Sequence, residues 1–317
     1  MLYLSIVKFY LGNTDYNWFS YLRAINPEDV NFWRPGGNAN FRAISPESPF
    51  IFKLKYPQNA IGGVGFLSHY TTLPLSVAWD IFGYRNGTET YLELQRLISN
   101  YRADRQSSNP QIGCIVLTNP IFFRKEDWIP VPADWSKSIV QGKTYSTHDL
   151  LGRALWEQIE VKLDKYLSNA DATTSPFLVS DPEVRYGSSI LKKVRLGQGA
   201  FRVLVTDAYT RRCTISGEKT LPVLEAAHIQ PYSEFGPHVL SNGILLRSDL
   251  HKLFDAGYVT ITKDYKVEVS RRIKEEFENG RDYYKYHGNP ILFLPKNEPD
   301  RPGISYLDWH NTVRYNG

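Results

Sequence analysis

The stretch from Cys213 to Tyr258 limits the possible folds more than any other part of the chain. In its first half, a strand-like apolar run ends at His228, and Pro231 then stops strand pairing. After a loop that contains glycine and proline, a second apolar run begins directly after Asn242. We therefore predict two short strands joined by a loop, with a histidine at the end of the first strand and an asparagine just before the second.

A helix is expected directly after the second strand, because Ser248 can cap its N-terminus. His251 and Asp255 are four residues apart on this helix and therefore share a face. The imidazole rings of His228 and His251 would then meet one carboxylate where the strand ends beside the helix. Such a set of side chains suits a divalent metal ion with a general base next to it.

This stretch resembles the ββα-metal fold of HNH endonucleases. The resemblance rests on Ala-Ala-His-Ile at 226–229, Asn-Gly-Ile-Leu-Leu at 242–246 and Asp-Leu-His-Lys-Leu-Phe-Asp at 249–255. The intervals from His228 to Asn242 and to His251 match those that family members use between the corresponding residues. A single histidine at a strand end is more often structural, but three residues at these offsets favour a nuclease site.

The resemblance implies a role for each catalytic residue. His228 would be the general base that activates water for attack on a phosphodiester. Asn242 would hold the loop and the histidine ring in place by hydrogen bonds. His251 would bind the metal ion, and Asp255 would supply a further ligand. Mg²⁺ is the expected ion, with Mn²⁺, Zn²⁺ or Ni²⁺ as alternatives.

One position departs from the family pattern. Many members have Asp or His directly before the general base, as a metal ligand, whereas this chain has Ala227. Either His251 and Asp255 hold the ion together with waters and phosphate oxygens, or a nearby carboxylate such as Glu225 compensates. Residues alternate sides along a regular strand, so Glu225 is expected on the face opposite His228. Asp255 is therefore the favoured ligand.

Basic residues flank the predicted site, and we interpret them as a track for DNA phosphates. A solvated basic face is the alternative interpretation. The net charge of +4 and the pI near 8.8 permit nucleic-acid binding without requiring it. The side chains expected to contact DNA are Arg195, Gln198, Arg202, Arg211, Arg212 and Arg247.

Short strands, glycine-rich bends and interspersed helices in the first half favour a small α+β barrel of roughly 150 residues. The layout of residues 2–143 resembles the PUA-like superfamily, whose SRA, EVE and YTH-type members hold a flipped or modified base in an aromatic-lined pocket. Packing in the core is the alternative role for each single aromatic residue. The resemblance implies that the pocket or its rim contains Trp18, Asn31, Trp33, Tyr70, Trp79, Asp80 and Tyr84.

The domain boundary is expected in a segment rich in Ser, Thr, Ala, Asp and Pro. We predict a PUA-like domain for modified DNA at 1–167, a linker at 168–189 and an HNH nuclease domain at 190–317. The fold class is therefore α+β, with a barrel joined to a ββα-metal domain. No apolar run reaches the roughly 18 residues that cross a bilayer, and no signal peptide is recognised, so we expect a cytoplasmic protein without a membrane partner.

Together these features predict a metal-dependent DNA endonuclease, a phosphodiester hydrolase that acts as a type IV-like restriction enzyme on modified double-stranded DNA. Cutting both strands with one site per chain would need a homodimer or two binding events. Two alternatives stay open. In one, Ala227 marks a disabled metal site and the chain only senses modified nucleic acid. In the other, the chain is an HNH nuclease of unmodified DNA, and its first half reads a short sequence.

Overall fold

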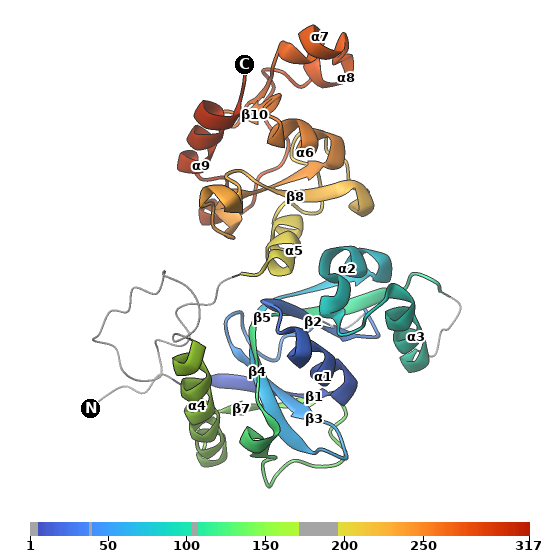
Figure 1. Cartoon of the computed structure of the whole chain (residues 1–317), viewed down its shortest axis with the longest axis vertical. Coiled ribbons are helices and arrows are strands. Elements are labelled where there is room, and N and C mark those ends of the chain that lie inside the picture. The colour runs from blue at the N-terminus through green and yellow to red at the C-terminus, as the bar shows by residue number, and fades with distance from the viewer. Residues whose placement is uncertain (1–5, 38–39, 103–106, 171–195) are drawn as a thin grey trace, which may run out of the picture. The chain divides into compact units, whose positions relative to one another are not determined.

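The computed structural model describes residues 6–37, 40–102, 107–170 and 196–317, which form two compact units (Figure 1). The chain divides after Ala200, so the second unit begins at Phe201. The predicted linker, 168–189, starts inside helix α4 (Leu150–Ala170) and lies outside the described residues from position 171. The domain boundaries at 167 and 190 therefore stay predictions.

A seven-stranded sheet is the centre of the N-terminal unit. Its order is β2-β5-β4-β3-β1-β7, with the short β6 paired to β4. Only β1 and β3 are parallel neighbours among the described pairs. The strands are β1 (Lys8–Thr14), β2 (Asp29–Arg34), β3 (Pro49–Leu54), β4 (Ala60–Pro74), β5 (Gln111–Phe122), β6 (Ile129–Pro130) and β7 (Gly142–Ser146).

The closed barrel predicted for this unit is not confirmed. In the described part of the sheet, β2 and β7 are the two edges and do not pair with each other. The glycines of β4 allow the neighbouring backbone to approach closely. At Gly63, for example, an added Cβ would lie 2.3 Å from the backbone oxygen of Ile121 on β5. The unit is therefore an α+β fold around an open sheet.

Alternation along the strands sends apolar side chains to both faces of the sheet. Leu11 of β1 and Ile51 of β3 belong to one apolar cluster with Trp156 of α4. Phe50 of β3 belongs to a second cluster with Phe19 of helix α1 (Tyr16–Ile25). The sheet is thus covered by α4 on one face and α1 on the other. This unit also contains helices α2 (Leu75–Phe82) and α3 (Tyr91–Tyr101).

The C-terminal unit is built around a hairpin and the helix that follows it. Strands β8 (Leu224–His228) and β9 (Gly243–Arg247) are antiparallel, and helix α6 (Ser248–Asp255) begins directly after β9. The predicted strand, loop, strand and helix are therefore confirmed. The other elements are α5 (Gln198–Ala208), which runs across the division between the units, β10 (Val259–Ile261), β11 (Val267–Val269), α7 (Arg272–Phe277), α8 (Arg281–Tyr284) and α9 (Ile304–Trp309).

The apolar side of the hairpin packs against helix residues in a single core. Ala227 and Ile244 from the two strands are fully buried together with Phe254 of α6 and Phe201 of α5. The position that carries a metal ligand in many HNH proteins is thus a core position here. Across the described residues, no helix is both long enough and apolar enough to span a membrane.

The predicted helix cap at Ser248 is wrong. Ser248 is the first residue of α6, Arg247 takes the capping position, and no side chain caps the helix by a hydrogen bond. The carboxylate of Asp249 in the first turn instead binds the guanidinium of Arg247, at 2.6 and 2.8 Å. An acidic residue in the first turn also interacts favourably with the helix dipole.

Candidate functional site

Asn242 fixes the loop that follows His228. His228 pairs with Gly243 in the hairpin, so Asn242 lies directly before its partner. The Asn242 side chain is fully buried, and its Oδ1 accepts a hydrogen bond from the Gln230 N–H at 2.9 Å. Its Nδ2 donates to the carbonyl oxygens of Gln230 at 2.9 Å and of Pro237 at 3.0 Å. The side-chain amide of Asn242, at the end of the loop, is therefore hydrogen-bonded to backbone groups at the start and in the middle of the loop.

The imidazole of His228 is held between an aromatic ring and a second histidine. It stacks on Phe201 with centroids 3.9 Å apart and 9° between the planes. Its Nε2 lies 2.8 Å from Nδ1 of His238. Burial, with the nearby imidazoles of His238 and His251, lowers the pKa of His228 to about 4. His228 is therefore neutral at pH 7, which is the form that a general base needs.

His238 is a residue that the sequence did not predict. It lies in the loop between β8 and β9, and its ring stacks on Tyr232 with centroids 4.9 Å apart. The only available signal was a second histidine ten positions after the first, inside a loop without regular spacing. The structure shows that His238 fixes the orientation of the His228 ring through Nε2.

His251 lies between two carboxylates. Its Nδ1 is 2.5 Å from Oε2 of Glu225, and its Nε2 is 3.3 Å from Oδ2 of Asp255. The Asp255 side chain is 54% exposed, so this side of the ring is open to solvent. Burial raises the pKa of Asp255, the charges of His251 and Arg314 oppose that increase, and the charge of Glu225 adds to it.

Glu225, expected on the strand face opposite His228, lies beside the candidate metal ligand His251. The alternation argument compared Glu225 with His228 inside one strand. His251, however, comes from helix α6, and its ring meets the Glu225 side chain directly. Since an ionised carboxylate only accepts, Nδ1 of His251 donates the proton in this bond. Glu225 thereby fixes the orientation of the His251 ring, with Nε2 on the side of Asp255.

The donor atoms of His251 and Asp255 fit a divalent ion. Nε2 of His251 and Oδ2 of Asp255 lie 3.3 Å apart, and an imidazole nitrogen with a carboxylate oxygen is a donor set that divalent ions accept. Within the described ranges, no three or more His, Cys, Asp or Glu side chains are arranged to hold a metal. An ion at this position would need further ligands from water or substrate oxygens, as Mg²⁺ commonly does.

Arg247 lies at the end of β9 and is already paired. Its Nε and a terminal nitrogen contact both carboxylate oxygens of Asp249. The Asp249 carboxylate raises the pKa of Arg247 above its usual value. A DNA phosphate would therefore have to compete with a bidentate ion pair, so Arg247 is a weaker phosphate ligand than its position in the sequence indicated.

The other residues predicted to contact DNA precede α5 in the sequence, belong to it or follow it. Arg195 is outside the described residues. Gln198 is the first residue of α5, and Arg202 is on the same helix. After the helix, Arg211 pairs with Asp207 at 2.9 Å, and the guanidinium of Arg212 lies 5.3 Å from the centroid of Phe293. Their contacts with DNA stay a prediction.

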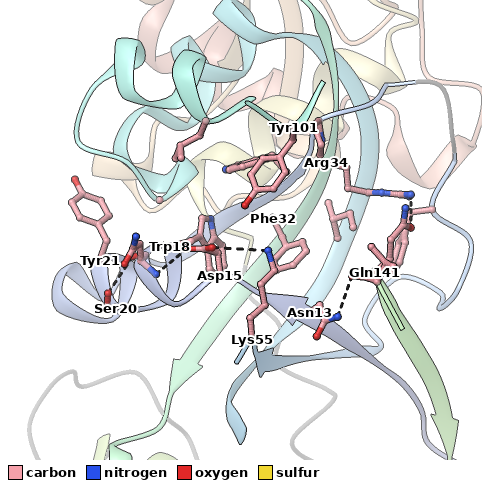
Figure 2. Close-up of a pocket in the computed structure, with 18 of the residues that line it drawn as sticks. Asn13, Asp15, Trp18, Ser20, Tyr21, Phe32, Arg34, Lys55, Tyr101 and Gln141 are labelled. Atoms are coloured by element: carbon pink, nitrogen blue, oxygen red, sulfur yellow. Dashed lines mark hydrogen bonds and ion pairs between the residues drawn. The ribbon is translucent and has the colours of Figure 1, made fainter. Parts of the chain in front are cut away.

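A cavity of about 860 Å³ lies in the N-terminal unit, on the α1 side of the sheet (Figure 2). Trp18 and Trp33, both predicted for the base pocket, line it. Gly87 also lines it, and its φ of +83° and its contact with the indole of Trp18 both require glycine, because an added Cβ would lie 2.0 Å from that ring. Aromatic residues missed by the prediction, including Phe32 and Tyr101, complete the wall.

Five predicted pocket residues do not line this cavity. The amide of Asn31 is buried and donates to Asn86 at 2.9 Å, and Tyr70 lies near Phe41 in the apolar cluster of the α1 face. Trp79 packs edge-on against a ring of α3. Asp80 and Tyr84 are exposed.

The comparison with protein families identifies the domain that contains these residues. Residues 213–262 match the model of a family described as HNH endonuclease. This part of the chain is an HNH endonuclease domain. It includes His228, Asn242, His251 and Asp255, so the resemblance predicted from the sequence is confirmed for this domain.

Among solved structures, the chain is similar to a modification-dependent TagI restriction endonuclease, with 22% identity and a TM-score of 0.28. That match covers 42% of this chain and 45% of the other, so the chain matches less than half the length of that relative. A mutant of the ZmASCH protein from Zymomonas mobilis matches with 8% identity and a TM-score of 0.30, over 42% of this chain and 87% of the other. No curated protein matches.

Proposed function

We propose that the chain is a metal-dependent DNA endonuclease in which His228 is the general base. The observation that carries the proposal is the state of this residue. His228 is neutral at physiological pH, and Phe201 and His238 hold its ring in place. A neutral, fixed imidazole in the same strand and helix unit as two candidate metal ligands suits hydrolysis of a phosphodiester.

Each side chain has a distinct part in this proposal. In this role Nε2 of His228 donates its proton to Nδ1 of His238, and Nδ1 of His228 keeps the lone pair that would take the proton from the attacking water. His251 and Asp255 would hold the ion, which we propose is Mg²⁺. When bound, the ion supplies positive charge for the phosphate oxygens and the leaving 3′ oxygen. Asn242 keeps the loop after His228 in position throughout.

We further propose that the N-terminal unit is a PUA-like reader that directs cleavage to modified double-stranded DNA, as in a restriction enzyme. The support is an aromatic-lined cavity in a unit separate from the nuclease site. Because each chain has one HNH domain within its described residues, cleavage of both strands would need two chains or two binding events.

Plasmid cleavage tests both parts of the proposal. Copies of one plasmid that carry cytosine, 5-methylcytosine or 5-hydroxymethylcytosine are incubated with the full chain in Mg²⁺ and, separately, in EDTA. We expect cleavage of a modified copy in Mg²⁺ only. Equal cleavage of all copies would support a nuclease of unmodified DNA, and selective binding without cleavage in any divalent metal would support a sensor.

A further inference from the structure

Phe235 is an exposed aromatic residue in the loop between β8 and β9. Its side chain is 88% exposed, which leaves the ring in solvent. Its backbone is also strained, because φ is +64° and ψ is +19°, a left-handed conformation that bulky side chains rarely adopt. Among the described residues, Tyr265 is the only other aromatic residue with a positive φ, and it packs against the core and donates a hydrogen bond to the Pro302 carbonyl oxygen at 3.1 Å. Packing therefore explains the conformation of Tyr265 but not that of Phe235.

The rest of the loop holds Phe235 in this conformation. The Phe235 N–H donates to the Tyr232 carbonyl oxygen at 3.1 Å, and the side chain of Gln230 donates to the carbonyl oxygen of Glu234 at 2.6 Å. Gly236 is buried, and an added Cβ would lie 1.8 Å from the Gln230 backbone oxygen. Backbone strain that persists because the surrounding contacts fix it is common at functional sites. The conformation therefore points to a use for the exposed ring.

The loop that carries Phe235 is connected to the proposed general base. The ring of Tyr232, three residues before Phe235, stacks on His238, and Nδ1 of His238 lies 2.8 Å from Nε2 of His228. A phosphate that is attacked at His228 therefore lies next to this loop. Because the grooves of B-DNA are about 6 and 12 Å wide, the bases beside such a phosphate come within reach of side chains on the loop.

The composition of the loop favours a contact with DNA bases over a contact with phosphates. Residues 229–242 contain no Lys or Arg, and Glu234 adds a negative charge next to Phe235. Phosphates are bound mainly by Arg and Lys, by polar side chains and by backbone N–H groups. An exposed aromatic ring instead stacks on a base or wedges between two bases, and neither contact needs a positive charge. The bases of the DNA substrate are therefore the partner that this loop fits.

We propose that Phe235 inserts into the DNA beside the scissile phosphate and stacks on a base, which separates that base from its neighbour. The inference rests on the proposed function, because it assigns a DNA contact to the nuclease site. Insertion holds the strand against His228 and distorts it near the bond that is cut. The domain loses some stability because the ring is presented from a left-handed backbone.

The contact is tested by binding of the full chain to duplex DNA in EDTA, which keeps the DNA intact. Several adenines on both strands are replaced by 2-aminopurine, so that an unstacked base is detected wherever the chain binds. Separate duplexes carry cytosine, 5-methylcytosine or 5-hydroxymethylcytosine, and the duplex that binds most tightly is used. We expect the 2-aminopurine fluorescence to rise on binding, because an inserted ring unstacks the base step that it enters.

Three variants of Phe235 and one matched control separate the base contact from a structural role. Phe235→Ala should weaken binding about tenfold in fluorescence anisotropy and remove at least about half of the fluorescence rise. Phe235→Trp keeps a ring that can stack and should bind within about twofold of the parent. Phe235→Gly lacks the ring but suits a left-handed backbone, so it should bind like the Ala variant while its urea midpoint equals or exceeds that of the parent. Phe277→Ala removes a ring of α7 that is 58% exposed in the same unit, and it should change neither binding nor fluorescence.

Parent-like affinity and fluorescence in both Phe235→Ala and Phe235→Gly would overturn this assignment. Sedimentation without DNA that differs between the parent and Phe235→Ala, together with unaltered DNA binding, would also overturn it and would identify the loop as a contact between two copies of the chain. Neither result bears on the nuclease proposal, which plasmid cleavage by the parent in Mg²⁺ tests separately. A chain that binds DNA through Phe235 but cuts none in any divalent metal would support the base contact and overturn the nuclease proposal.

Discussion

Removal of the Glu225 carboxylate should weaken metal binding without unfolding the domain. Glu225 accepts the Nδ1 proton of His251 at 2.5 Å, and this bond orients Nε2 towards Asp255. Loss of such an outer partner typically weakens metal affinity by about 10 to 100-fold. Because Glu225 is 41% exposed, solvent screens the interaction, and we expect the lower end, about tenfold or 1.4 kcal/mol, for Glu225→Ala.

Calorimetric titration with Mn²⁺ in the presence of uncleavable duplex DNA measures this effect directly. Glu225→Gln keeps an acceptor for Nδ1 and should lose only about threefold. Glu275→Ala, which removes an exposed carboxylate from α7 of the same unit, should leave the affinity unchanged. Parent-like affinity in Glu225→Ala would refute the assigned role of Glu225. An equal loss of Mn²⁺ affinity in the Gln and Ala variants would show that the charge of Glu225, and not the orientation of the His251 ring, contributes to metal binding.

Three further predictions concern the C-terminal unit. Asn242→Ala should lower its free energy of unfolding by about 3 kcal/mol, measured by urea denaturation, because backbone groups of Gln230 and Pro237 lose their partner. Single-turnover cleavage should keep its rate as the pH falls through 6.5 and lose it only near the His228 pKa of about 4; a loss centred at 6.5 would contradict this. Burial lowers the pKa of His310 to about 4, so between pH 6.5 and 4 the unfolded state binds a proton that the folded state does not. Stability should therefore fall in that window, and urea midpoints at pH 7 and 5 should differ less in His310→Gln than in the parent.

The HNH domain could be predicted because its parts are close in sequence. His228, Asn242 and His251 lie on a strand, a loop and a helix within 50 residues, so fixed offsets in the sequence identify the domain. The pairing of His228 with Gly243 follows from the two apolar runs. The role of His238 and the contact of Glu225 with His251 were not predicted, because they depend on the path of the loop and on how α6 packs against β8. Neither leaves a periodic signal.

The cavity was harder to predict because residues far apart in the chain form it. Its wall combines positions from Tyr10 to Gln141, and sequence patterns do not fix which side of each strand faces it. On β2, Phe32 and Trp33 line the cavity, whereas Asn31 is buried against Asn86. The resemblance in layout implied an aromatic-lined pocket, but only the arrangement of the paired strands identifies the residues that line the cavity.

The central claim is that His228 removes the proton from the attacking water. Its most direct test is single-turnover cleavage of the modified plasmid in Mg²⁺ by the parent, by His228→Ala and by His148→Ala, which replaces an exposed histidine of the N-terminal unit. We predict that His148→Ala cleaves like the parent and that His228→Ala loses at least about a hundredfold in rate while binding the same DNA. Equal cleavage rates for the parent and His228→Ala would contradict the account.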